Sequence, residues 1–254
     1  MSRYRRPLAL RPEPAAAVPE VAMVLAAGLG KRMRPLTSTR PKPLVEVAGK
    51  PLIDHCFDRL RAAGVRKAVV NVHYLADALE AHLSTRVQGI EIAVSDEREQ
   101  LLETGGGLVK ALPLIDADPF LVVNSDNLWV DGPVDSLRLL ASNWDEARMD
   151  ALLLLVPLAR AQCHKGQGDF HMNPAGVLRR RKAGAVAPFV FTGIQIVSKR
   201  LLAGTHPQGP FSTNIFWDQA ISAGRLFGVG HQGLWFDVGA PENIRKTEEV
   251  LAGG

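Results

Sequence analysis

Short runs of Val, Leu and Ile alternate along the chain with segments in which apolar residues recur at helical spacing. Continuous apolar runs predict buried strands, and the spaced pattern predicts helices. We expect strands at 21–27, 68–72, 90–95, 120–124 and 151–156, and helices at 51–63, 77–83, 107–112 and 134–142. Strands that lack polar alternation are typical of sheets covered on both faces. The pattern therefore predicts an α/β protein with a mostly parallel central sheet.

Beyond residue 157 the apolar segments become shorter and are separated by glycines. We expect the segments 168–172, 188–198, 226–230 and 233–238 to complete the sheet and to cap a ligand pocket. A closing helix is predicted at 241–251, because Pro241 suits a first helical turn. Residues 1–20 contain four prolines and are predicted to be a disordered or loosely attached arm, which leaves 21–254 as one domain.

Charge and cysteine content exclude several classes of protein. The formal net charge is +4, and half of it comes from the four Arg and two Glu of residues 1–20. The rest is too sparse for a nucleic-acid-binding face. No apolar run approaches the length of a membrane span, and no export signal is expected. Cys56 and Cys163 make no disulfide framework, so we expect reduced thiols in a cytoplasmic protein.

The first apolar run leads directly into a glycine-rich turn that carries cationic residues. Gly28 and Gly30 are followed by Lys31 and Arg32, and Lys42 stands between two prolines. Glycines let main-chain N–H groups approach phosphate oxygens closely. Cationic side chains neutralise the charge that the backbone holds. The turn therefore predicts a polyphosphate site.

The alternatives for this turn are a dinucleotide-binding fingerprint, a Walker loop and a plain turn with no ligand. The third glycine of the dinucleotide fingerprint is replaced by Met33, which disfavours a dinucleotide-dependent oxidoreductase. No Gly-Lys-Ser/Thr follows at the spacing of a Walker loop. A plain turn with solvated basic residues is disfavoured by the tight clustering of Gly, Lys, Arg and Pro.

Asp126 and Asp237 each follow an apolar run, where a strand is expected to end. Magnesium prefers oxygen ligands and takes one or two carboxylates together with phosphate oxygens. Each aspartate alone suits a turn cap equally well. Together with the phosphate turn, the pair predicts a Mg²⁺ site.

A second glycine cluster, Leu-Leu-Glu-Thr-Gly-Gly-Gly at 101–107, precedes a predicted helix. Glycine has no Cβ, so we expect Thr104, Gly105 and Gly106 to lie against a planar base. The alternative is a flexible loop in which Glu103 caps the helix. Asp169, in a loop before a short strand, suits hydroxyl binding, and a simple hairpin turn explains it equally well.

These motifs make the chain resemble the sugar-1-phosphate nucleotidyltransferases from about residue 21 to 251. The resemblance rests on Leu25–Thr37, Pro41–Leu44, Leu102–Gly107, Asn124–Asp126 and the segments 168–170, 191–194 and 235–239. It implies a Rossmann-like α/β/α sandwich that converts NTP and a sugar 1-phosphate to NDP-sugar and pyrophosphate. Within the family, it is similar to the bacterial uridylyltransferases of cell-wall recycling that use UTP and N-acetylmuramate 1-phosphate.

The resemblance also implies the role of each site residue. Catalysis falls to Arg32, Lys42 and Asp126, and the metal ligands are Asp126 and Asp237. Sugar contacts fall to Asn124, Asp169, Thr192 and Gly193. The nucleotide is held by Leu25, Ala26, Ala27, Gly28, Gly30, Lys31, Arg32, Met33, Lys42, Asn71, Glu103, Thr104, Gly105 and Gly106. The nucleotide-binding half is then about 21–125 and the sugar-binding half about 126–254.

The expected partners are an NTP and a sugar 1-phosphate, with no nucleic acid or membrane, in a monomer or small homo-oligomer. A mannose-1-phosphate guanylyltransferase and a catalytically silent nucleotide-binding regulator are the alternatives. The chain departs from the family pattern twice. Ser125 stands where the family has glycine, and 181–183 replaces a Glu-Lys-Pro motif. The sequence therefore does not identify the cationic residue that holds the sugar phosphate.

Overall fold

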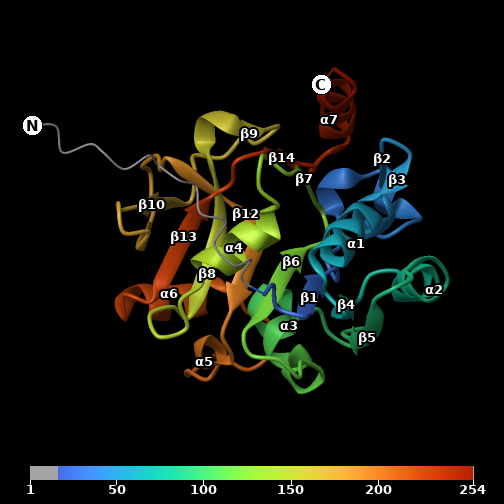
Figure 1. The fold of residues 1–254 in the computed structure, drawn as a ribbon. Helices are drawn as coiled ribbons and strands as arrows, with labels where there is room; N and C mark the ends of the chain where they lie inside the picture. The colour runs from blue at the N-terminus through green and yellow to red at the C-terminus, as the bar shows by residue number, and fades with distance from the viewer. Residues whose placement is uncertain (1–16, 254) are drawn as a thin grey trace, which may run out of the picture.

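A central sheet runs through the described part of the chain, residues 17–253 of a computed structural model (Figure 1). Four neighbouring strands are parallel, in the order β5 (Glu91–Asp96), β4 (Lys67–Val72), β1 (Val21–Leu25) and β6 (Phe120–Asn124). The sheet continues through an antiparallel strand to two more that are parallel to each other, namely β12 (Phe189–Val197), β8 (Ala151–Pro157) and β13 (Leu226–Gly230). A hairpin pairs with the start of β12 and consists of β10 (Phe170–Met172) and β11 (Leu178–Arg180). The mostly parallel sheet expected from the apolar runs is confirmed.

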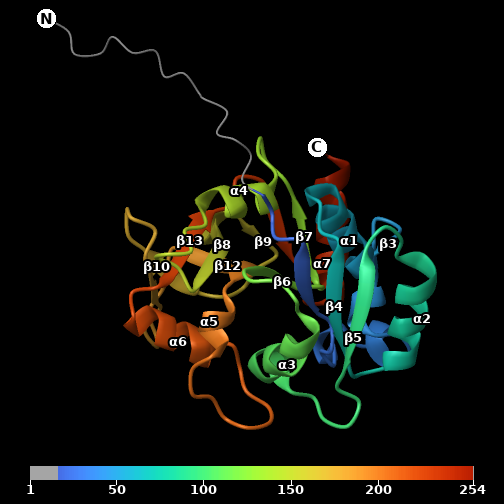
Figure 2. The ribbon, with the colours of Figure 1, turned by 60° about the horizontal axis from the view of Figure 1, so that its bottom comes forward.

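Helices cover both faces of the sheet, and the alternation of side chains along the strands builds a core on each side (Figure 2). One face packs against α1 (Leu52–Ala63), α2 (Ala76–Arg86) and α4 (Ser136–Asn143). The other face packs against α3 (Glu103–Ala111), α5 (Lys199–Leu202) and α6 (Asn214–Ser222). In β1, for example, Ala22 and Val24 belong to the first core, whereas Val21 and Met23 belong to the second. This arrangement is the expected α/β/α sandwich.

A smaller sheet stands beside the carboxyl ends of the central strands. It contains β7 (Asn127–Val130), β14 (Leu234–Asp237) and β9 (Ala161–Gln162). Its apolar side chains form a third cluster with Met33 and Val45, next to the hairpin of β2 (Glu46–Val47) and β3 (Lys50–Pro51) and to α7 (Pro241–Ala252). Strand β7 follows β6 in the chain, and β14 pairs with β7. The small sheet therefore brings two segments together that are about 100 residues apart in the chain.

The expected elements agree with the structure in position, and the differences lie where long-range contacts decide. The cluster 103–107 forms the first turns of α3 instead of a loop before it. Helix α6 was not among the expected elements. Residues 1–16 of the predicted arm lie outside the described residues. Residues 17–20 belong to the domain, because Val18 is buried in the core and the Glu20 carbonyl accepts hydrogen bonds from the N–H groups of Arg66 and Lys67.

Within residues 17–253, none of the helices has both the length and the apolar character needed to cross a bilayer.

Candidate active site

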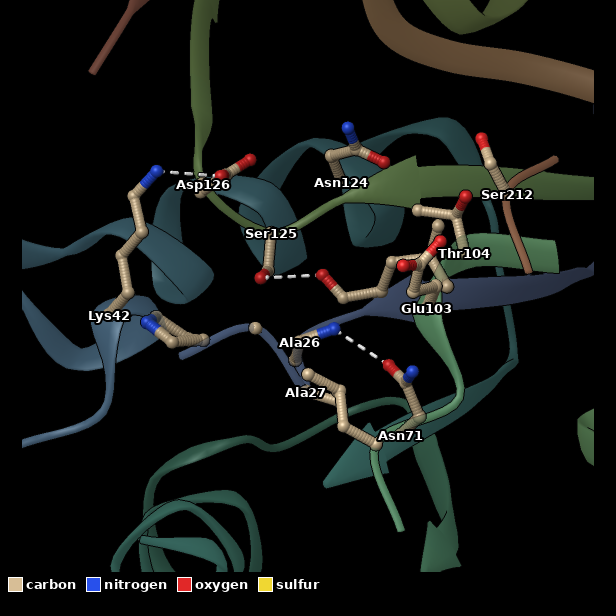
Figure 3. A pocket seen from close by; sticks show the side chains of 14 residues that line it. Ala26, Ala27, Lys42, Asn71, Glu103, Thr104, Asn124, Ser125, Asp126 and Ser212 are labelled. Carbon is tan, nitrogen blue, oxygen red and sulfur yellow. Dashed lines mark hydrogen bonds and ion pairs between the residues drawn. The ribbon is translucent and has the colours of Figure 1, made fainter. Parts of the chain in front are cut away.

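A cavity of about 380 Å³ opens at the carboxyl ends of β1 and β6 (Figure 3). These strands are parallel and in register at Leu25 and Asn124, so the segments that follow them meet at one edge of the sheet. Ligands bind outside the carboxyl ends of strands in open α/β sheets. Ten of the residues expected at the site line this cavity: Leu25, Ala26, Ala27, Gly28, Lys42, Asn71, Glu103, Thr104, Asn124 and Asp126. Pro43, Leu101, Ser125 and Ser212 also line it and were not assigned to the site from the sequence.

An ion pair between Lys42 and Asp126 marks one end of the cavity. Lys42 Nζ donates to Asp126 Oδ2 over 2.7 Å, and the lysine side chain is only 11% exposed. Lys42 lies between Pro41 and Pro43 and begins the 3-10 helix Lys42–Leu44. A cation that is largely buried and faces an open cavity needs anionic neighbours, since its desolvation is otherwise costly. This end of the cavity therefore suits the phosphates of a ligand.

Asp237 joins this end through the ladder of the small sheet. In the antiparallel pairing of β14 with β7, Asp237 lies opposite Asn127, the residue after Asp126. Its carboxylate contacts His164 Nδ1 at 3.2 Å. That hydrogen bond, together with the charges of His164, Arg32 and Lys42, holds the pKa of Asp237 below its usual range despite partial burial. The strand pairing therefore places Asp237 opposite the residue that follows Asp126.

The donor set at this end fits a magnesium ion. Asp126 follows β6 and Asp237 ends β14, and no group of three or more metal-binding side chains occurs within residues 17–253. Magnesium is commonly held by one or two carboxylates, with phosphate oxygens and water completing its shell. A structural zinc site would need about four protein ligands, so the residues present suit Mg²⁺ with a phosphate ligand.

The glycine-rich turn is only partly in the cavity. Gly28 lines it, and the turn then enters the 3-10 helix Lys31–Met33. Arg32 lies beside Asp237, because a Cβ built on Gly239 would meet Asp237 Oδ1 at 2.8 Å and Arg32 Nη1 at 3.1 Å. The expectation that Met33 contacts the nucleotide is wrong for its side chain, which is completely buried in the third apolar cluster. Gly30 has a φ of +59°, which strains other residues, and a Cβ there would lie only 3.0 Å from side-chain atoms of Thr37 and Lys42.

The glycines at 105–107 are buried, and other parts of the protein occupy the space beside them. The N–H groups of Gly105 and Gly106 both donate to the Phe211 carbonyl, at 2.8 and 3.2 Å. A Cβ on Gly105 would lie 2.6 Å from the Phe211 ring, and one on Gly106 would lie 2.5 Å from the Gly209 carbonyl. These glycines are needed because the segment 209–211 packs directly on α3. Their expected role as bare backbone against the base is therefore corrected.

A buried hydrogen-bond chain supports the wall of the cavity. Ala26 N donates to Asn71 Oδ1 at 2.7 Å, and Asn71 Nδ2 donates to Glu97 Oε1 at 2.8 Å. Glu97 Oε2 accepts from Leu102 N at 3.0 Å, and Glu97 is completely buried. Asn71 thus has its amide oxygen and nitrogen engaged by protein, and it positions the turn that follows β1. Glu97 was not expected here, because it belongs to a charged run, 96–99, that resembles a solvated loop.

The residues expected to bind the sugar are separated in the structure. Asn124 lines the cavity, and Gly193 packs against it, since a Cβ on Gly193 would lie 2.9 Å from Asn124 Nδ2. Asp169 lines a second cavity of about 210 Å³ with Arg180 and Arg181. Thr192 is completely buried, and its hydroxyl donates to the Leu154 carbonyl at 2.8 Å. A sugar contact by the Thr192 hydroxyl is therefore corrected.

Ser125, which replaces the family's glycine, ties the two strand ends together. Its N–H and its hydroxyl both donate to the Leu25 carbonyl, at 3.1 and 2.8 Å. The side chain adds a hydrogen bond that glycine lacks and is not free to act as a nucleophile.

Comparison with known proteins agrees with this fold. The family model described as nucleotidyl transferase matches residues 21–162, and the chain belongs to this family. It is 46% identical to N-acetylmuramate alpha-1-phosphate uridylyltransferase from Caulobacter vibrioides, over 92% of this chain and 98% of that protein. It is 37% identical to the protein of the same name from Neisseria meningitidis serogroup B, over 91% of this chain and 98% of that protein.

The fold is also shared with solved structures. A UDP-glucose pyrophosphorylase complexed with UDP-glucose superimposes with a TM-score of 0.77 at 16% identity, over 92% of this chain and 99% of that chain. At this identity the likeness concerns the fold. It places the present sheet and its covering helices in the same architecture.

Proposed function

We propose that this protein transfers UMP from UTP to N-acetylmuramate 1-phosphate, giving UDP-N-acetylmuramate and pyrophosphate. The observation that carries the proposal is the Lys42–Asp126 pair at 2.7 Å at one end of the cavity, with Asp237 opposite Asn127 on the neighbouring strand. A reaction between two anions needs positive charge, which one buried lysine supplies and which a divalent cation held by the two aspartates would also supply. The choice of substrates is supported by two relatives of that name, which match over nearly their whole length.

The chemistry needs positioning and charge neutralisation more than a base. A phosphate oxygen of the sugar 1-phosphate attacks the α-phosphorus of UTP, and the bond from that phosphorus to the β-phosphate's bridging oxygen breaks. Pyrophosphate leaves with the electron pair of that bond. Since the attacking phosphate is already anionic, no proton has to be removed by a side chain. Holding the two substrates in line supplies much of the rate enhancement in such reactions.

Individual residues divide this work. Lys42 stabilises the α-phosphate as its charge shifts, and Arg32 neutralises the departing pyrophosphate. Gly28 lets the phosphates approach the main chain after β1. Asn124, which lines the cavity between the ion pair and the far end, contacts the sugar. Asp126 and Asp237 would hold Mg²⁺, which supplies charge neutralisation between the nucleotide and the sugar phosphate.

The test is a matrix of substrates with purified protein and Mg²⁺. UTP, GTP, CTP and ATP are each combined with N-acetylmuramate 1-phosphate or mannose 1-phosphate, and pyrophosphate release is followed while products are identified by mass. We expect the highest kcat/KM with UTP and N-acetylmuramate 1-phosphate, and no pyrophosphate without a sugar phosphate. Faster turnover of GTP with mannose 1-phosphate would instead support a guanylyltransferase. Nucleotide binding without pyrophosphate release would support a silent regulator.

The proposal includes a cytoplasmic role in the recycling of cell-wall sugars. The cytoplasmic part of this proposal is supported by Cys56 and Cys163, which are both free thiols, as is usual in a reducing compartment. Burial raises the pKa of the Cys56 thiol to about 12, so it stays protonated and takes no part in the chemistry.

A further inference from the structure

The end of the cavity away from the ion pair has few groups left to recognise a nucleobase. In Figure 3, Glu103, Thr104 and Ser212 lie at the opposite side of the view from Lys42 and Asp126. Four main-chain donors near this end are engaged by the protein. Ala26 N donates to Asn71, Leu102 N donates to Glu97, and the N–H groups of 105 and 106 donate to Phe211. The side chains that line this end are therefore candidates for recognising the base.

Glu103 is the acidic side chain at this end, and the structure leaves it available. It lines the cavity, it is exposed, and it makes no hydrogen bond or ion pair with any residue in the range 17–253. Its neighbour Thr104 accepts a hydrogen bond from Thr213 N at 2.9 Å, so the Thr104 hydroxyl proton remains free to donate. An acceptor and a donor thus stand next to each other in the chain.

The strained backbone conformation at Glu103 indicates a functional role for its side chain. Its φ is +58°, a left-handed conformation that glycine adopts without strain and that side chains rarely adopt. Thr104 and then three glycines follow, and a glycine at position 103 itself would adopt this φ without strain. Strained positions of this kind concentrate at ligand sites. A charged residue without a protein partner, held at such a position in the wall of the cavity, points to a ligand as its partner.

We infer that Glu103 is a specificity-determining residue that accepts a hydrogen bond from the ring N–H of the base and thereby selects uracil over cytosine. The inference rests on the proposed function for the identity of the nucleotide. Uracil presents N3–H to an acceptor and a carbonyl oxygen on each side to a donor such as the Thr104 hydroxyl. Cytosine presents a lone pair at N3, which a carboxylate repels. A site built around a hydrogen bond rejects the analogue that cannot make it.

The test compares UTP with CTP and with N3-methyl-UTP, in which the N–H is replaced by a methyl group. The wild-type protein and the Glu103→Gly and Glu103→Gln variants are assayed for kcat/KM with N-acetylmuramate 1-phosphate. We expect the preference for UTP to fall about 10- to 100-fold in Glu103→Gly, the range for a hydrogen bond to a charged group. Glu103→Gln keeps part of the preference against N3-methyl-UTP, since its amide oxygen still accepts, and turns over CTP better, since its NH₂ donates to N3.

Folding and turnover are separated from base selection by two further measurements. Glu103→Gly should melt no lower than wild type, because glycine relieves the strained φ. Calorimetric titration of UTP and CTP without any sugar phosphate reports base selection even if the proposed sugar is wrong. Unchanged UTP to CTP ratios in Glu103→Gly, in both assays, would overturn the inference. Absent turnover of N-acetylmuramate 1-phosphate by wild type, with UTP still bound in preference to CTP, would overturn only the proposed reaction.

Discussion

Lys42 and Asp126 are 84 residues apart in the chain, yet Nζ and Oδ2 lie 2.7 Å apart at the mouth of the cavity. The lysine comes from the segment after the glycine-rich turn, and the aspartate comes from the end of β6. Each partner offsets the cost of desolvating the other. The pair therefore holds charged groups at the place where the proposed reaction needs a phosphate.

Asp126→Asn is expected to abolish turnover while leaving the protein folded. The amide loses the charge that pairs with Lys42 and that would hold Mg²⁺, but it keeps the size of the side chain. Initial rates of pyrophosphate release and thermal unfolding are measured together. Asp116→Asn is the matched control, because Asp116 pairs with Lys67 at an exposed position. Near-normal activity of Asp126→Asn with Mg²⁺ would remove Asp126 from the metal site.

Lys42→Ala should lower kcat more than it raises KM. If the ammonium group stabilises charge that develops only in the transition state, its removal costs about 10²- to 10³-fold in kcat, as for other electrostatic stabilisers. Steady-state kinetics with both substrates varied gives the two constants. Lys50→Ala, at a lysine that pairs with Asp58 outside the cavity, should leave both constants unchanged. A kcat equal to that of wild type contradicts the assigned role.

Gly107→Ala is expected to destabilise the protein although alanine favours helices. A Cβ there would lie 2.8 Å from Glu97 Oε1 and 3.0 Å from Asn71 Nδ2, so the buried chain must move. Overpacking of this kind costs about 1–3 kcal/mol, against a helix-propensity gain of about 1 kcal/mol. Chemical denaturation measures the free energy of unfolding. Gly230→Ala serves as the control, since no atom lies within 4 Å of its Cβ; equal effects of the two substitutions would refute the packing argument.

The unfolding free energy should decrease as the pH falls below about 6.5, the ordinary pKa of histidine. Burial lowers the pKa of His231, whose ring lies between the Ser136 hydroxyl and the Leu234 carbonyl. As the pH falls, the histidine is protonated in the unfolded chain before it is protonated in the native protein. The stabilisation that comes from burying neutral His231 is therefore complete above the pKa of the unfolded chain and is lost on acidification. Denaturant unfolding at pH 5 to 8 measures the slope. His231→Gln should flatten it, and an unaltered slope in that variant would assign the effect to other groups.

The strands and helices were predictable because each one carries its own signal. Segments 51–63, 120–124 and 226–230 bury continuous or helically spaced apolar residues, and they form α1, β6 and β13 at nearly the expected bounds. Helix α6 was missed although Phe216, Trp217 and Ala220 are buried along it. The cavity was predictable in outline, because the carboxyl ends of parallel strands meet at one edge.

Local sequence patterns were enough to predict the α/β architecture, and they also led to the predictions of a phosphate site after β1 and of a metal site at two aspartates. These predictions depend on residues that are close together in the chain. Long-range packing, in contrast, buries Met33 and Thr192, sets 209–211 against Gly105 and Gly106, and places Glu97 against Asn71. Each of those outcomes depends on a neighbour tens of residues away, whose position follows from the packing of the whole domain.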